Sequence, residues 1–120
     1  MARILIIDDD EKLLEILRRM LEQEDYEIMM ASDGVEGMEQ HRRHPADIII
    51  TDLFMPRQEG IETILRIKQE TPGVKFIAIS GGGSVAGMDY LELAANVGAE
   101  RTLAKPFKRH ELLAAIKELL

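Results

Sequence analysis

The strongest constraint on the fold is a regular alternation between two sequence patterns. Five short apolar runs, made mostly of Ile, Leu, Val and Met, recur along the chain. Runs of this length, bounded by Asp, Gly or Pro, are typical of strands that are mostly buried on both faces. The predicted strands are residues 4–7, 26–31, 47–51, 74–79 and 102–104.

Segments with the period of an amphipathic helix separate these runs. Apolar residues recur at spacings of three and four, which predicts one buried face per helix. The second helix is expected to begin near Val35 and to stop before Pro45. The fourth is expected to span residues 85–97 and to end at Gly98. The predicted apolar positions of the third and fourth helices include Ile61, Ile64, Leu65, Met88, Leu91, Ala94 and Ala95.

Alternating strands and helices predict a parallel sheet with right-handed crossovers and helices on both faces. Five such units favour a doubly wound, flavodoxin-like α/β sheet with strand order 2-1-3-4-5. A chain of 120 residues is the size of one domain, and we expect residues 1–120 to form it. In such sheets, ligands bind at the carboxyl ends of the strands, near the point between strands 1 and 3 where the order reverses.

The composition excludes several classes of function. The chain contains no cysteine, so a disulfide framework, a thiolate metal site and a cysteine nucleophile are impossible. Its formal net charge of -7 opposes binding to nucleic acid or to an anionic membrane surface. No apolar run approaches the ~18 residues of a membrane span, and no signal peptide opens the chain. We therefore expect a cytoplasmic domain.

Charged and polar side chains directly follow four of the predicted strands. Asp8 and Asp9 follow the first strand, Asp52 the third, Ser80 the fourth and Lys105 the fifth. Because these strand ends share one edge of the sheet, the side chains should converge there. Like charges this close repel, so the pKa of at least one carboxyl should rise. A Mg²⁺ ion, which prefers oxygen ligands, would relieve the repulsion and let an anionic phosphoryl group approach.

An aspartate in such a site can act as a nucleophile. A carboxylate attacks phosphorus to form an acyl phosphate, in chemistry that depends mostly on positioning and charge neutralisation. Lys105 and Ser80 would then hold the phosphoryl oxygens. A purely structural interpretation, in which an aspartate caps the following helix, needs one residue, and we assign that role to Asp10. The three histidines, which we expect to be exposed to solvent, are His41, His44 and His110.

Four motifs together resemble the receiver domain of bacterial two-component response regulators, the CheY-like superfamily. They are ILIIDDD at 4–10, DIIITDLFMPRQEGIE at 47–62, FIAIS at 76–80 and LAKPF at 103–107. The resemblance covers essentially the whole chain. It implies that Asp52 is the phosphoacceptor, that Asp9 binds Mg²⁺ directly and that Asp8 acts largely through water. Asp52 and the backbone carbonyl of Phe54 would be further Mg²⁺ ligands.

The resemblance also implies how such a domain signals. Ser80 matches the switch hydroxyl, and Lys105 matches the lysine that pairs with the phosphoryl group, with a cis peptide expected at Lys105–Pro106. The phosphoryl donor would be a sensor histidine kinase or a histidine phosphotransfer domain. In related receivers, the face formed by the fourth helix, fifth strand and fifth helix often supports a homodimer or an effector contact. The domain would catalyse only its own phosphorylation and dephosphorylation, so it is not expected to be an enzyme with a separate substrate.

Some features depart from the family pattern. Thr102 stands where the family usually has an aromatic ring that moves with the switch hydroxyl, and a small β-branched residue cannot replace that movement. Three consecutive glycines, residues 81–83, predict a loop that stays mobile until the switch hydroxyl moves. Tyr90, Leu93 and Val97 form a second apolar stripe, which is either a partner surface or partly buried.

Other functions fit parts of the pattern less well. A pseudo-receiver, which binds partners without being phosphorylated, stays open because of Thr102 and the glycine loop. A phosphohydrolase of the haloacid-dehalogenase type needs an acid/base group two residues after its nucleophile, and Phe54 cannot move a proton. A flavin carrier needs a phosphate-binding loop after the first strand, where this chain has three aspartates.

Overall fold

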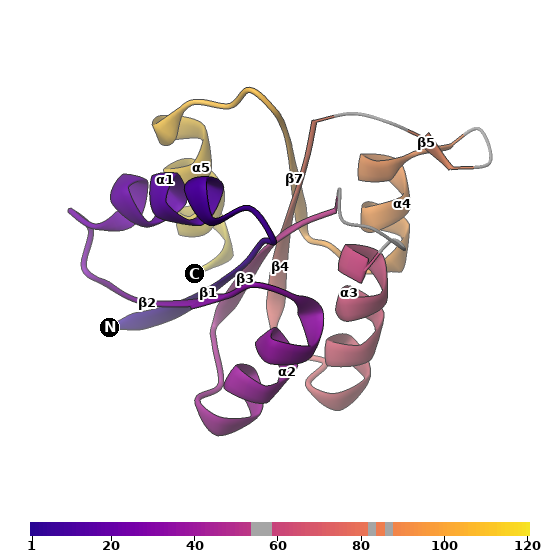
Figure 1. The fold of residues 1–120 in the computed structure, drawn as a ribbon, viewed down its shortest axis with the longest axis horizontal. Coiled ribbons are helices and arrows are strands. Elements are labelled where there is room, and N and C mark those ends of the chain that lie inside the picture. Colours follow the sequence, from indigo (N-terminus) through magenta and orange to yellow (C-terminus); the bar gives the residue numbers. More distant parts are fainter. Residues whose placement is uncertain (54–58, 82–83, 86–87) are drawn as a thin grey trace.

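A five-stranded sheet forms the centre of the molecule (Figure 1). The structure is a computed structural model that describes the backbone of residues 1–53, 59–81, 84–85 and 88–120. The strands are β1 (Ala2–Ile7), β2 (Tyr26–Ala31), β3 (Ile48–Asp52), β4 (Lys75–Ser80) and β7 (Arg101–Ala104). Their order is β2-β1-β3-β4-β7 and every pairing is parallel, which confirms the predicted order 2-1-3-4-5.

Five helices cover the two faces of this sheet. They are α1 (Glu11–Leu21), α2 (Gly34–Arg43), α3 (Glu59–Glu70), α4 (Tyr90–Val97) and α5 (Arg109–Leu119). Helices α1 and α5 lie on one side, and α2, α3 and α4 lie on the other (Figure 1). Within the described part of the chain, no helix has the length and apolar character needed to span a membrane.

Alternating side chains along the central strands build two apolar cores. Leu5, Ile49 and Phe76 pack on the side of α2, α3 and α4. Ile4 and Ile48, their neighbours along the strands, pack on the side of α1 and α5. These five side chains are fully buried. Because both faces of β1, β3 and β4 are used for packing, the polar side chains that these strands carry into the site stand at their carboxyl ends.

Two helix ends form as predicted. Asp10 caps α1, where its Oδ1 accepts hydrogen bonds from the backbone N–H groups of Lys12 at 2.9 Å and Leu13 at 3.4 Å. At the end of α4, Gly98 adopts a φ of 121°, a backbone conformation that favours glycine. The structural role assigned to Asp10 is therefore confirmed.

The prediction for the fourth helix is wrong at its start. Helix α4 begins at Tyr90, and the residues before it form a short antiparallel pair, β5 (Ser84–Val85) and β6 (Met88–Asp89). Asp89 accepts a hydrogen bond from the Glu92 N–H at 2.8 Å, which caps the helix at this point. Ala95 is exposed, contrary to the prediction, whereas Ala94 is fully buried.

The second apolar stripe on α4 is partly buried where the structure describes it. Leu93 and Val97 are half-buried and pack against the core beneath α4. The side chains of Tyr90 and Met88 lie outside the described part of the chain. The partly buried alternative is thus supported for two of the three residues in the stripe.

The prediction that all three histidines are exposed is also wrong. His41 is 4% exposed, its Nδ1 accepts the Ala46 N–H at 3.0 Å, and its Nε2 lies 3.3 Å from Thr71 Oγ1. Burial lowers the pKa of His41. It was missed because the buried face of α2 is formed by Gly34, Gly37 and His41, which carry little apolar signal.

Leu65 also differs from the predicted pattern of the third helix. Its side chain is 44% exposed, and the buried stripe of α3 continues through Ile67 instead. The second helix begins at Gly34, next to the predicted start at Val35, and the Val35 side chain is 65% exposed.

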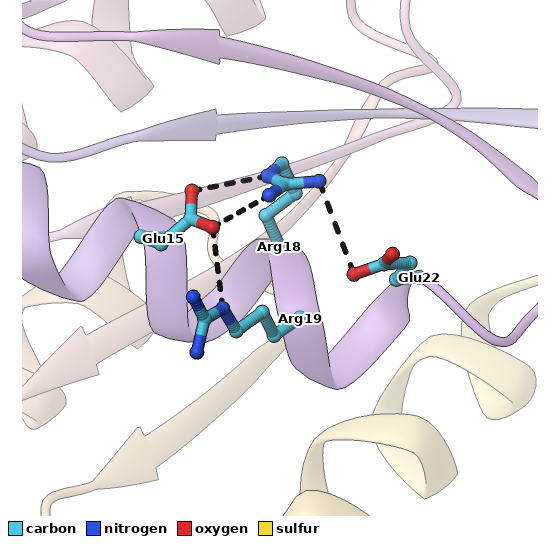
Figure 2. Close-up of polar contacts among 4 residues, drawn as sticks. All are labelled: Glu15, Arg18, Arg19 and Glu22. Carbon is cyan, nitrogen blue, oxygen red and sulfur yellow. Dashed lines mark hydrogen bonds and ion pairs between the residues drawn. The ribbon is translucent and has the colours of Figure 1, made fainter.

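The outward face of α1 carries a network of charged side chains (Figure 2). Glu15 contacts both Arg18, at 2.5 Å, and Arg19, at 3.2 Å, and Arg18 also lies 3.9 Å from Glu22. The Arg18 guanidinium is the main cause that lowers the pKa of Glu15. These exposed pairs, spaced three and four residues apart, favour the helix locally and keep this face in solvent.

Candidate functional site

Three carboxylates meet at the carboxyl ends of β1 and β3. Asp8 and Asp9 directly follow β1, and Asp52 is the last residue of β3. Asp8 is 1% and Asp52 is 5% exposed, whereas Asp9 is open to solvent. One oxygen from each of the three lies within 4.8 Å of the others, so that the set could hold a metal ion. The predicted convergence of these side chains is therefore present.

Backbone hydrogen bonds fix the position of Asp8. Its N–H donates to the carbonyl of Ala31 at 3.1 Å, which extends the pairing between β1 and β2. Its Oδ1 accepts the N–H of Asp10 at 2.8 Å. Because Asp10 also caps α1, the position of the Asp8 carboxyl is fixed both by the end of β1 and by the start of α1.

Burial raises the pKa of Asp8 to about 7. The negative charge of Asp52 and a side-chain hydrogen bond with it act in the same direction, whereas the Asp10 N–H and the Lys105 charge lower this pKa. Near neutral pH, the Asp8 carboxyl therefore holds a proton for part of the time. The pKa of one carboxyl rises as predicted, but burial contributes more to this rise than the predicted repulsion.

The donor set suits Mg²⁺. Carboxylate oxygens are the hard ligands that this ion prefers. A divalent cation held by Asp8, Asp9 and Asp52 would compete with the proton on Asp8 and offset the repulsion between Asp8 and Asp52, which adds to the effect of burial. The residues present therefore fit the ion that the sequence implies.

Lys105 and Ser80 complete the same edge of the sheet. Lys105 Nζ lies 3.3 Å from Asp52 Oδ2, and its backbone N–H donates to the Ser80 carbonyl at 2.9 Å. Ser80 is the last residue of β4 and is fully buried. The peptide bond between Lys105 and Pro106 is cis, as predicted. The Lys105 ammonium thus lies beside the buried Asp52 carboxylate. Ser80 ends β4, the strand between β3 and β7.

Three residues named in the sequence analysis lie outside the described part of the chain, and Thr102 lies within it. Phe54, whose carbonyl is an expected Mg²⁺ ligand, lies outside the described residues, as do Gly82 and Gly83 of the glycine loop. Thr102 is half-buried on β7, opposite Ala78 of β4 in the parallel pairing.

Gly60 belongs to the motif at residues 47–62, but the sequence did not reveal its role at the site. It is buried in the first turn of α3, and a Cβ atom there would lie 2.5 Å from the carbonyl oxygen of Asp52. Glycine in a helix is unfavourable unless close packing requires it.

Comparison with known proteins gives one consistent family. Residues 4–117 match the family described as response regulator receiver domain. Response regulator MprA of Mycobacterium leprae (strain TN) is 36% identical in an alignment that covers 98% of this chain and 50% of that protein. Response regulator MprA of Mycobacterium ulcerans (strain Agy99) is 34% identical, with 99% of this chain and again 50% of that protein covered. The chain spans about half the length of these curated relatives.

Solved structures give the same result for the fold. A response regulator receiver domain protein from Clostridium thermocellum has a TM-score of 0.88 at 31% identity, with 99% of this chain and 94% of that chain covered. A CheY-like receiver domain protein from Methanospirillum hungatei JF-1 has a TM-score of 0.87 at 31% identity, with 98% and 92% covered. The likeness in sequence and in structure extends over nearly the whole chain.

Proposed function

Because the chain belongs to the response regulator receiver domain family of two-component signalling, we propose that Asp52 accepts a phosphoryl group from a phosphohistidine. The observation that carries this proposal is the meeting of four charged groups at one sheet edge. Oxygens of Asp8, Asp9 and Asp52 lie within 4.8 Å of one another, and Lys105 Nζ lies 3.3 Å from Asp52. The unit that carries out the reaction is residues 1–120.

The proposed step is an in-line displacement at phosphorus. A carboxylate oxygen of Asp52 forms a bond to phosphorus while the bond between phosphorus and the donor histidine nitrogen breaks. The electron pair of the broken bond stays on the imidazole, and Asp52 becomes an acyl phosphate. The Lys105 ammonium, already beside Asp52, balances negative charge on the transferred group. Attack by water on the same phosphorus later breaks its bond to the Asp52 oxygen, which releases inorganic phosphate and returns Asp52 to a carboxylate.

We propose that Asp8, Asp9 and Asp52 hold Mg²⁺ together with the backbone carbonyl of Phe54. The bound ion would neutralise charge on the phosphoryl oxygens. The support from the fold is the donor set itself, in which one oxygen from each carboxylate lies within 4.8 Å of the others. Burial is the main cause that raises the pKa of Asp8, and the nearby charge of Asp52 adds to it.

The proposed output depends on Ser80. Ser80 ends β4 opposite Ala104 of β7, directly before Lys105, and its hydroxyl would move to bind the phosphoryl group and carry the glycine loop with it. Thr102 lacks a ring that could follow this movement, so the signal would depend on the loop after β4.

Two kinds of partner follow from this function. The donor would be a sensor histidine kinase or a histidine phosphotransfer domain. The acceptor of the signal would be a second copy of the chain or an effector domain on the face formed by α4, β7 and α5. That face carries the exposed ion pair between Arg101 and Glu118, while Leu93 and Val97 are half-buried. A contact there would rest more on polar groups than on the apolar stripe.

Intact-mass spectrometry after incubation with acetyl phosphate tests the proposal. We expect one added phosphoryl group on the wild type, only when Mg²⁺ is present, and none on Asp52→Asn. Sampling must be fast enough to trap a short-lived acyl phosphate. Mg²⁺ binding without any adduct would contradict phosphorylation and favour a pseudo-receiver that binds partners in one state.

A further inference from the structure

Gly60 lies where the first turn of α3 meets the backbone that ends β3. A Cβ atom at this position would be 2.5 Å from the carbonyl oxygen of Asp52 and 2.9 Å from Cα of Leu53. Ordinary Cβ contacts begin at 3.4 Å, so a side chain would require a displacement of about 0.9 Å. Both crowding atoms belong to the backbone, and no change of rotamer can move them away.

Neither side of this contact moves easily. Leu53 is fully buried, and its N–H donates to the Ile79 carbonyl at 2.9 Å, which ties the end of β3 to β4. On the helix, Ile61 is 6% exposed and Ile64 is fully buried in the core between α3 and the sheet. The missing side chain of Gly60 thus allows two well-anchored pieces of backbone to touch.

We propose that Gly60 is a positioning residue for the phosphoacceptor, because its lack of a side chain lets the first turn of α3 fix the backbone that carries Asp52. The inference rests on the proposed function of Asp52. The Asp52 carboxylate must stay at its distances from Lys105 Nζ and from the oxygens of Asp8 and Asp9. A shift of its backbone approaching 1 Å is enough to misplace a reacting group.

Other glycines in the fold provide a comparison. At Gly37, a Cβ would lie 2.5 Å from Ile7 Cδ1, the far end of a side chain and not backbone. At Gly73, in the exposed turn between α3 and β4, a Cβ atom would have no atom of the described residues within 4 Å apart from those of its chain neighbours. Crowding against the phosphoacceptor backbone is therefore a property of Gly60, and Gly73→Ala is a suitable control.

The test compares three variants under conditions in which far-UV circular dichroism shows each to be folded. They are Gly60→Ala, Gly73→Ala and Ile67→Ala. Ile67 is 1% exposed on the same helix, two turns further from the site, so that its truncation lowers stability without touching Asp52. The readouts are the initial rate of phosphorylation by acetyl phosphate and the Mg²⁺ concentration that gives half the maximal rate.

We expect Gly60→Ala to slow phosphorylation by about 10-fold to 100-fold and to change the half-saturating Mg²⁺ concentration, with both controls within about twofold of the wild type. A purely structural role would lower stability in Gly60→Ala and Ile67→Ala alike and leave both readouts unchanged. A folded Gly60→Ala with wild-type values for both would overturn the inference and leave the proposed function intact.

A second variant keeps the test decisive if Gly60→Ala does not fold. Ile64 lies four residues after Gly60 on the same helix face, so Ile64→Ala loosens the first turn of α3. We expect slower phosphorylation in Ile64→Ala than in Ile67→Ala, and equal rates would overturn the inference. A wild-type chain that takes no phosphoryl group at all would overturn the proposed function and this inference with it.

Discussion

At the scale of single residues, Asp8 shows how a buried carboxyl at the candidate site lowers the stability of the fold that contains it. Its carboxyl is 1% exposed and faces Asp52, and burial raises its pKa from 3.8 to about 7. In the unfolded chain, the same carboxyl loses its proton near pH 4. Between these values, the unfolded chain releases a proton that the folded chain keeps. The free energy of unfolding therefore falls as the pH rises from about 4 to about 7.

We predict that Asp8→Asn removes this pH dependence when no divalent cation is present. Asn keeps an oxygen that can accept the Asp10 N–H, but it does not titrate. Its gain in unfolding free energy over the wild type should grow with pH and reach the order of a few kcal/mol above pH 7. Urea unfolding at several pH values in EDTA measures this difference in unfolding free energy, with Asp25→Asn as the exposed control. The prediction fails if the wild type and Asp8→Asn show the same pH dependence.

At the scale of elements, a half-buried ion pair joins α3, β4 and the turn before β7. Lys68 Nζ contacts Glu100 and donates to the Val74 carbonyl at 2.8 Å. The other oxygen of Glu100 accepts the Phe76 N–H at 2.6 Å. The Lys68 and Glu100 side chains are 19% and 22% exposed, so water reaches this network only in part. The pair thus closes the end of the sheet opposite the functional site.

We predict that Glu100→Ala lowers the free energy of unfolding by about 1–3 kcal/mol, because Phe76 N–H and Lys68 Nζ lose a partner in a sheltered place. Glu118→Ala, which breaks the exposed pair with Arg101, should cost about 1 kcal/mol or less. Denaturant unfolding and hydrogen exchange at the Phe76 amide provide the measurement. Equal losses in the two variants, with unchanged exchange at Phe76, would show that the network adds nothing to the elements it joins.

The sequence predicts best the elements whose packing depends on apolar side chains. The sheet order follows from the alternation of strands and helices, and the strand bounds agree closely. The start of α4 was not predicted, because the helical spacing continues through residues that instead form β5 and β6, while Asp89 caps the helix. His41 was not predicted, because its neighbours on the buried face of α2 are Gly34 and Gly37.

The site shows the same division. The meeting of Asp8, Asp9 and Asp52 could be predicted, since strand order alone brings these chain positions to one edge. Which carboxyl has the raised pKa could not, because burial decides it and burial depends on the packing of neighbouring elements. The contact made by Gly60 could not be predicted either, although the residue belongs to the motif that contains Asp52, because the distance between α3 and the end of β3 is a property of the folded chain.

At the scale of the whole molecule, the parallel sheet collects charges from segments far apart in the chain. Asp8 directly follows β1, Asp52 ends β3 in the middle of the chain, and Lys105 directly follows β7. In a chain with a net charge of -7, the acidic edge opposes folding unless a cation binds there. A ligand at this edge therefore stabilises segments that meet only in the folded state.

We predict that Mg²⁺ raises the free energy of unfolding, by about 2.7 kcal/mol at 100 times its dissociation constant. The effect should be larger at pH 8 than at pH 5, because below the pKa of about 7 a proton on Asp8 competes with the ion. Thermal and urea unfolding with and without Mg²⁺ measure it, and NaCl at matched ionic strength accounts for screening of the net charge. Asp9→Asn should lose most of the Mg²⁺ effect, because the exposed Asp9 carboxylate belongs to the three-carboxylate cluster. An equal rise in Asp9→Asn and in the wild type would place the stabilising ion elsewhere on the acidic surface.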